Sequence, residues 1–139
     1  MSEANMLKVL TRPYVMIGSD GSLRAPTGQL SQDHPHPRAY GTFPRFLQLV
    51  LEGKAPISIE TAIHKMTAMA AEQFDIRDRG VLREGMKADI VVFRAPEFRD
   101  RSTFAEPHQF AEGMQYVIVN GRVTLRNGSV TDERGGVWL

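Results

Sequence analysis

The first half of this chain offers a single candidate β-strand, the run Tyr14-Val15-Met16-Ile17, which ends at Gly18. A short, continuous apolar run bounded by a turn residue is typical of a strand buried on both faces. One such strand leaves two unpaired edges, so it cannot complete a sheet by itself. The run 14–17 must therefore find neighbours elsewhere, either in this chain or in another one.

The segment after this strand, residues 18–41, has no usable hydrophobic period and contains four glycines, three prolines and two histidines. A loop of this length inside a compact domain is uncommon and is usually either functional or disordered. An amphipathic helix is predicted next, over about 43–52, with Thr42 as its N-cap, Pro44 in its first turn and Gly53 at its end.

The rest of the chain changes from helical to strand-like periodicity. Ser58 is the predicted N-cap of a second helix over 59–74, whose apolar residues form one stripe. Three runs typical of strands follow, at 90–93, 116–119 and 122–125. Asn120-Gly121 separates the last two and favours a hairpin, because both residues tolerate the positive φ angles of a tight turn. The pattern is half of an α/β unit joined to a small β region.

Composition narrows the function classes. The chain has 139 residues, with 17 Lys and Arg against 16 Asp and Glu, which gives a net charge of +1. Such a balance argues against a protein that binds nucleic acid or an acidic membrane surface. The absence of cysteine excludes disulfides and thiolate catalysis. With no secretory signal and no apolar run of roughly 20 residues, the expected location is the cytoplasm.

Asp20 is the first candidate for chemistry, because it comes just after the strand 14–17 and lies between two glycines. In an α/β sheet, side chains at the carboxyl end of a strand face the ligand crevice. A carboxylate there can orient a metal or accept a proton from water. The alternative is an ordinary turn residue that hydrogen-bonds its own backbone.

His34 and His36, together with Asp33, suggest a metal site, since imidazole and carboxylate are zinc ligands. However, a catalytic zinc needs about three protein ligands, and alternate residues of an extended loop point apart. Ordinary hydrogen bonds are therefore the favoured role of these histidines. Arg38 and Arg45 are candidate anion-binding residues, and the alternative for each is a solvated side chain or an ion pair with Asp33.

Several motifs, considered together, resemble one enzyme family. They are Val-Met-Ile-Gly-Ser-Asp-Gly (15–21), His-Pro-Arg (36–38), Tyr-Gly-Thr-Phe-Pro-Arg (40–45), Lys-Met-Thr (65–67), the segment 78–93, and Val-Asn-Gly (119–121). The sequence resembles the D-aminoacylases, the N-acyl-D-amino-acid deacylases of the amidohydrolase superfamily. The segment 78–93 is shared by many amidohydrolases, whereas the Ser-Asp-Gly, His-Pro-Arg and Gly-Thr-Phe-Pro-Arg motifs are much narrower.

The resemblance implies a metal-dependent TIM barrel with a small β-sandwich, of which this chain supplies the C-terminal portion. Residues 1–75 would be the end of the barrel, with 14–17 as its last strand, the two predicted helices outside it and an active-site loop at 18–41. Residues 76–139 would supply C-terminal strands of the sandwich. The implied fold class is therefore α/β.

The resemblance also implies roles for two residues. Asp20 would be the catalytic acid/base beside zinc, and a metal-site residue, while Arg38 would bind the α-carboxylate of an N-acyl-D-amino acid. The family's other zinc ligands lie upstream of the matching region, so the chain would be inactive without an upstream half-enzyme. Self-association is the other expected partnership. The alternative is a non-catalytic scaffold or partner-binding module. The connection from Asp20 to Arg38 is also longer than is usual in the family, with an apparent extension at 25–29.

Overall fold

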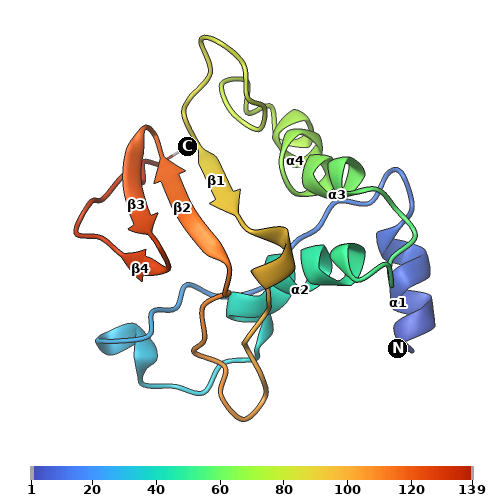
Figure 1. The fold of residues 1–139 in the computed structure, drawn as a ribbon, viewed down its shortest axis with the longest axis horizontal. Coiled ribbons are helices and arrows are strands. Elements are labelled where there is room, and N and C mark those ends of the chain that lie inside the picture. The colour runs from blue at the N-terminus through green and yellow to red at the C-terminus, as the bar shows by residue number, and fades with distance from the viewer. Residues whose placement is uncertain (1, 139) are drawn as a thin grey trace.

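The computed structural model describes residues 2–138 and divides them into a helical half and a sheet half (Figure 1). The helices are α1 (Glu3–Leu10), α2 (Arg38–Leu51), α3 (Ile59–Met66) and α4 (Ala68–Gln73), with a short 3-10 turn at Gln29–Ser31. The strands are β1 (Ile90–Phe93), β2 (Met114–Val119), β3 (Arg122–Arg126) and β4 (Ser129–Val130), with a second 3-10 turn at Ala95–Glu97. The mixture of helix and strand agrees with the predicted class.

Two serines begin helices, because each side chain accepts a hydrogen bond from a backbone N–H that the first turn leaves unpaired. Ser2 Oγ accepts from the N–H of Asn5, and Ser58 Oγ accepts from the N–H of Thr61 at 3.2 Å. The cap predicted at Ser58 is therefore confirmed.

Helix α2 begins earlier than the sequence predicts, so the proposed N-cap at Thr42 is wrong. The helix starts at Arg38, after Pro37, and Pro44 lies inside it rather than in its first turn. Gly41 lies within the added turn, where the side chain of Asp100 approaches its backbone closely. A Cβ on Gly41 would lie only 2.8 Å from Asp100 Oδ1. The predicted end is confirmed, since Gly53 follows the helix with a φ of +70°.

The helix predicted over 59–74 is interrupted at Thr67, which separates α3 from α4 with φ −130° and ψ −93°. The Thr67 hydroxyl donates to the carbonyl oxygen of Ile63 at 2.7 Å. Threonine side chains that bond back to the preceding turn in this way compete with the helical backbone and often bend it.

The helical half has one hydrophobic core, which α2, α3 and the segment after α1 share. Its buried members are Ile17, Phe46, Leu49, Val50, Ala55 and Ala62, and partly buried residues of α1 and α3 pack against them. Tyr14 lies in a turn and residues 15–17 belong to no strand, so the strand predicted at 14–17 is not formed within the described chain. The N–H of Ile17 donates instead to the carbonyl oxygen of Lys65 at 3.4 Å.

The sheet is an antiparallel meander with the strand order β1-β2-β3-β4. The hairpin between β2 and β3 is confirmed, and Asn120 and Gly121 have the positive φ angles that the turn requires, +49° and +80°. Arg79 fixes this turn to β1, because its guanidinium donates to Asp89 at 2.6 Å and to Asn120 Oδ1 at 3.2 Å.

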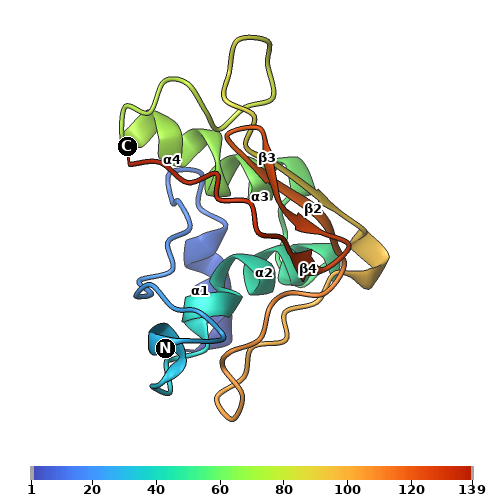
Figure 2. The ribbon, with the colours of Figure 1, turned by 90° about the vertical axis from the view of Figure 1, so that its left-hand side faces the viewer.

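Two long connections extend to the same end of the molecule. One is the loop 18–37 before α2, and the other is the segment 98–113 between β1 and β2 (Figures 1 and 2). Within residues 2–138, no helix has the length and apolar character needed to cross a membrane.

Candidate functional site

Asp20 lies in an irregular segment and has a left-handed backbone conformation, with a φ of +47°. Next to it, the Ser19 hydroxyl accepts the N–H of Gly21 at 3.2 Å. Aspartate tolerates this conformation better than most residues, and such backbones cluster at functional sites. The Asp20 side chain is 87% exposed. The carboxylate therefore faces solvent instead of packing against the chain.

Arg38 begins α2, and the structure brings it to Asp20 across the loop. Arg38 Nη2 lies 2.9 Å from Asp20 Oδ2, and the arginine side chain is 47% exposed. Exposed ion pairs contribute at most about 1 kcal/mol, so this pair opens readily. A ligand carboxylate offers the guanidinium the same two oxygens and can replace Asp20 there.

The structure gives the loop histidines ordinary hydrogen bonds. His34 Nε2 lies 2.7 Å from the carbonyl oxygen of Phe104, and His36 Nδ1 accepts the N–H of Arg38 at 3.1 Å. Asp33 forms an ion pair with Arg24 at 2.8 Å. The alternative pairing of Arg38 with Asp33 is therefore wrong.

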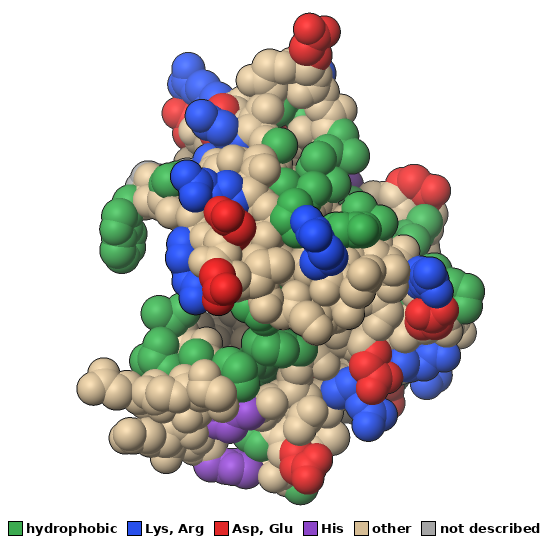
Figure 3. All heavy atoms as spheres, turned by 60° about the vertical axis from the view of Figure 1, so that its left-hand side comes forward, with side chains coloured by type: hydrophobic (Ala, Val, Ile, Leu, Met, Phe, Trp, Pro, Cys, Tyr) green, Lys and Arg blue, Asp and Glu red, His purple; other side chains and the backbone are tan. Residues whose placement is uncertain are grey.

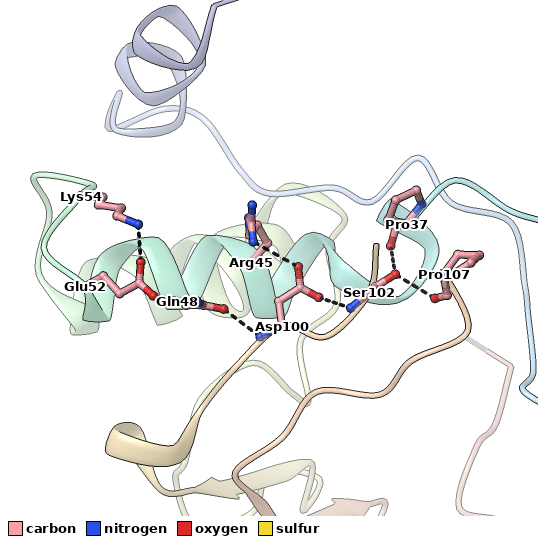
Figure 4. Close-up of polar contacts among 8 residues, drawn as sticks. All are labelled: Pro37, Arg45, Gln48, Glu52, Lys54, Asp100, Ser102 and Pro107. Carbon is pink, nitrogen blue, oxygen red and sulfur yellow. Dashed lines mark hydrogen bonds and ion pairs between the residues drawn. The ribbon is translucent and has the colours of Figure 1, made fainter. Parts of the chain in front are cut away.

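Arg45 also avoids Asp33. Its Nη1 lies 3.9 Å from Asp100 Oδ2, at the far limit of an ion pair. Asp100 is held on the side of α2, where its N–H donates to Gln48 Oε1 at 2.8 Å (Figure 4). Burial raises the pKa of Asp100, whose side chain is only 7% exposed. Arg45 therefore lies beside a buried carboxyl group instead of facing the loop as a free anion-binding residue.

The zinc that the family resemblance implies has no complete set of ligands among residues 2–138. Across residues 2–138, no three His, Asp or Glu side chains come together in a group that would hold a metal ion. Asp20 is one carboxylate, already paired with Arg38, whereas a catalytic zinc takes about three protein ligands. The residues that the structure describes therefore do not by themselves fit the metal.

One residue of this region has no signal in the sequence. His108 lies in the irregular segment before β2, yet both of its ring nitrogens have partners in the first half of the chain. Nδ1 lies 3.0 Å from the Tyr40 hydroxyl, and Nε2 lies 2.9 Å from the carbonyl oxygen of Asp33. Those partners are 68 and 75 positions away, so no local pattern reveals them.

Histidine and apolar side chains gather at one edge of the molecule around these contacts (Figure 3). The rings of His36 and Phe104 meet edge to face at 4.9 Å, and those of Tyr40 and Phe110 at 5.8 Å. The loop 18–37 is thus attached by rings and hydrogen bonds to the segment 98–113.

Comparison with known proteins places the chain in a family. The amidohydrolase family model matches residues 15–125, which is most of the sequence. The chain belongs to the amidohydrolase family. This amidohydrolase chain is 38% identical over 139 residues to an N-acyl-D-aspartate deacylase of Alcaligenes xylosoxydans xylosoxydans, covering 100% of the chain and 26% of the relative. It is 35% identical over 136 residues to a D-aminoacylase of the same organism, covering 98% and 27%. The resemblance to D-aminoacylases is confirmed.

Solved structures of related enzymes are also similar to this chain. A crystal structure of D-aminoacylase has a TM-score of 0.85 and 36% identity, covering 98% of the amidohydrolase chain and 27% of that structure. An N-acyl-D-glutamate deacylase from Bordetella bronchiseptica, complexed with zinc and a phosphonate mimic of the tetrahedral intermediate, has a TM-score of 0.78 and 36% identity, covering 89% and 25%. The chain thus spans about a quarter of the length of these relatives.

Proposed function

We propose that this chain is the C-terminal part of a zinc-dependent N-acyl-D-amino-acid deacylase, which hydrolyses the amide of N-acyl-D-amino acids. The observation that carries the proposal is the 2.9 Å pair of Asp20 and Arg38 in a chain 38% identical to an N-acyl-D-aspartate deacylase. Hydrolysis of this substrate needs an acid/base group and a group that binds the substrate carboxylate. Asp20 and Arg38, which lie side by side, would supply the two groups.

In the proposed reaction, Arg38 releases Asp20 and binds the α-carboxylate of the substrate. The freed Asp20 accepts a proton from the water that attacks the amide carbonyl carbon. The C–N bond then breaks, and Asp20 returns the proton to the departing nitrogen, which leaves a carboxylate and a free D-amino acid. Exchanging one anion for another at Arg38 thus couples substrate binding to release of the base.

The proposal assigns residues 1–75 to the end of a TIM barrel and residues 76–139 to the sandwich. The segment around Ile17 supports it, because this buried residue pairs with no strand in the described chain. Exposed apolar side chains on the sheet, Val91, Val92, Tyr116 and Val130, also favour a further layer of protein. The missing neighbours and the zinc ligands would come from an upstream half-enzyme, and self-association would cover the same surfaces in its absence.

The test mixes this chain with a polypeptide that carries the remaining portion of the N-acyl-D-aspartate deacylase, and measures bound zinc and release of free D-aspartate. The mixture is expected to bind zinc and turn over. Removing a general acid/base costs about 10²- to 10⁴-fold in rate, so Asp20→Asn is expected to lower kcat by that factor.

Asp75→Asn is the matched control, because Asp75 also has a positive φ, of +55°, and also pairs with an arginine, at 2.9 Å. This variant is expected to leave the rate within twofold. A stable complex that binds no zinc and releases no D-aspartate would favour a non-catalytic scaffold or partner-binding module instead.

A further inference from the structure

The segment 98–113, which lies between β1 and β2, contacts the N-terminal turn of α2 at several points (Figures 1 and 4). The Ser102 hydroxyl lies 3.0 Å from the carbonyl oxygen of Pro37 and 2.8 Å from that of Pro107. The Ser102 N–H donates to Asp100 Oδ1 at 3.0 Å, which holds the serine against the helix. The first turn of α2 is therefore fixed by residues more than 60 positions further along the chain.

His108 makes the second attachment, and its hydrogen-bond roles follow from its partners. A carbonyl oxygen can only accept a hydrogen bond, so Nε2 carries the proton and donates it to the backbone carbonyl oxygen of Asp33. In the neutral ring Nδ1 is then an acceptor, and the Tyr40 hydroxyl donates to it at 3.0 Å. Burial raises the pKa of Tyr40, which keeps that hydroxyl protonated and able to donate.

These two attachments bracket Arg38. Pro37, immediately before it, is held by Ser102, and Tyr40, two residues after it, is held by His108. An arginine side chain has several rotatable bonds, and ordering it costs about 2 kcal/mol of entropy. Fixing the backbone on both sides of Arg38 limits where its guanidinium can go, and Nη2 lies 2.9 Å from Asp20 Oδ2.

We propose that His108 is a positioning residue that acts through Tyr40 to hold Arg38 where the α-carboxylate of the substrate binds. This inference rests on the proposed function for its catalytic consequence, although the attachment itself belongs to this chain alone. His108 touches neither substrate nor Asp20 in this scheme, and its effect reaches the reaction only through the first turn of α2.

The first experiment uses the chain by itself and measures amide hydrogen exchange at Tyr40 and Gly41, whose N–H groups both donate to the carbonyl oxygen of Pro37. Losing a neutral hydrogen bond weakens such a turn by up to about tenfold in its opening equilibrium. His108→Ala and the milder Tyr40→Phe are each expected to speed this exchange by about threefold to tenfold. His64→Ala, at an exposed histidine on α3, is expected to change nothing there.

The second experiment uses the enzyme assembled from the two portions and compares two substrates. For an N-acyl-D-amino acid, Tyr40→Phe and His108→Ala are each expected to raise KM by about threefold to tenfold and to leave kcat within twofold. For the corresponding N-acyl-D-amino acid amide, which lacks the α-carboxylate, neither variant is expected to change KM.

The outcomes separate this inference from the proposed function. Unchanged exchange at Tyr40 and Gly41 in both variants would overturn the attachment. An equal loss with both substrates would show that His108 acts on the fold in general, and would also overturn the inference. If the assembled wild-type enzyme shows no turnover, the proposed deacylase function and the effect of His108 on substrate binding both fail, and the exchange data then decide only whether the attachment exists.

Discussion

Lys65 connects α3 to the segment that follows α1, although it is a buried lysine. It is 1% exposed, and its Nζ donates to the carbonyl oxygens of Arg12 and Val15. Its own carbonyl oxygen accepts the N–H of Ile17 at 3.4 Å. One residue of α3 therefore fixes the segment that leads directly to Asp20.

The perturbation is Lys65→Met, which keeps an unbranched side chain of similar length and removes the donors. Hydrogen bonds from a charged donor are worth about 1.5–3 kcal/mol each, so losing two costs about 3–6 kcal/mol. Methionine also avoids the cost of burying an ammonium group, which offsets several kcal/mol of that loss. We expect a net loss of about 2 kcal/mol in the free energy of unfolding at pH 7, or roughly 6 °C in Tm. Lys65→Ala also loses packing and should fall about 2–5 kcal/mol further.

The pH dependence identifies the cause. Burial lowers the pKa of Lys65, so the folded chain releases this proton at a lower pH than the unfolded chain does. From that lowered pKa up to the unfolded value of about 10.4, the unfolded state binds more protons and folding is favoured by rising pH. The stability difference between wild type and Lys65→Met should therefore grow with pH in this window.

The assay is urea unfolding of both proteins, followed by circular dichroism, in steps from pH 7 to pH 10. The account predicts a wild type that is more stable at pH 7, with an advantage that increases towards pH 10. A methionine variant as stable as the wild type, with a difference that does not change with pH, would refute the reasoning about Lys65.

Four further substitutions test other parts of the structure. Burial raises the pKa of Asp100, so the protonated carboxyl group contributes fully to folding stability below about pH 4, and that contribution is lost as pH rises through the folded pKa. Urea unfolding should therefore show that the wild type loses stability relative to Asp100→Asn between pH 4 and pH 7. Gly113→Ala should destabilise by at least about 2 kcal/mol in thermal melts, because its Cβ would meet Phe98 backbone atoms at 2.8 Å at a φ of +79°. Gly128→Ala, with a φ of +77° and open space, should cost only about 1 kcal/mol. Ser58→Ala should cost about 1 kcal/mol through the lost N-cap of α3, and helical circular dichroism during urea unfolding measures it.

Local signals in the sequence account for the parts of the fold that depend on neighbouring residues. The cap at Ser58 and the hairpin at Asn120-Gly121 are formed as predicted, since their hydrogen bonds and φ angles involve residues a few positions apart. The start of α2 at Arg38 is missed, and its first turn contacts residues that are distant in the sequence, such as Ser102, whose hydroxyl lies 3.0 Å from the carbonyl oxygen of Pro37.

In the candidate site too, local features are predictable from the sequence and contacts between distant segments are not. The glycines beside Asp20 are a local signal of unusual backbone conformation, and Asp20 has a left-handed φ of +47°. Its pairing with Arg38 depends on the path of the loop, and the role of His108 depends on two residues from the other half of the chain.

We propose that Asp20 is an acid/base group whose metal partners lie outside this chain. The most direct measurement titrates the upstream portion against a fixed amount of this chain and follows release of free D-aspartate from N-acyl-D-aspartate. The account predicts no turnover without the upstream portion, a rise to a plateau near equimolar mixing, and loss of that plateau in Asp20→Asn. Turnover by the purified chain alone, or an undiminished plateau in Asp20→Asn, would contradict it.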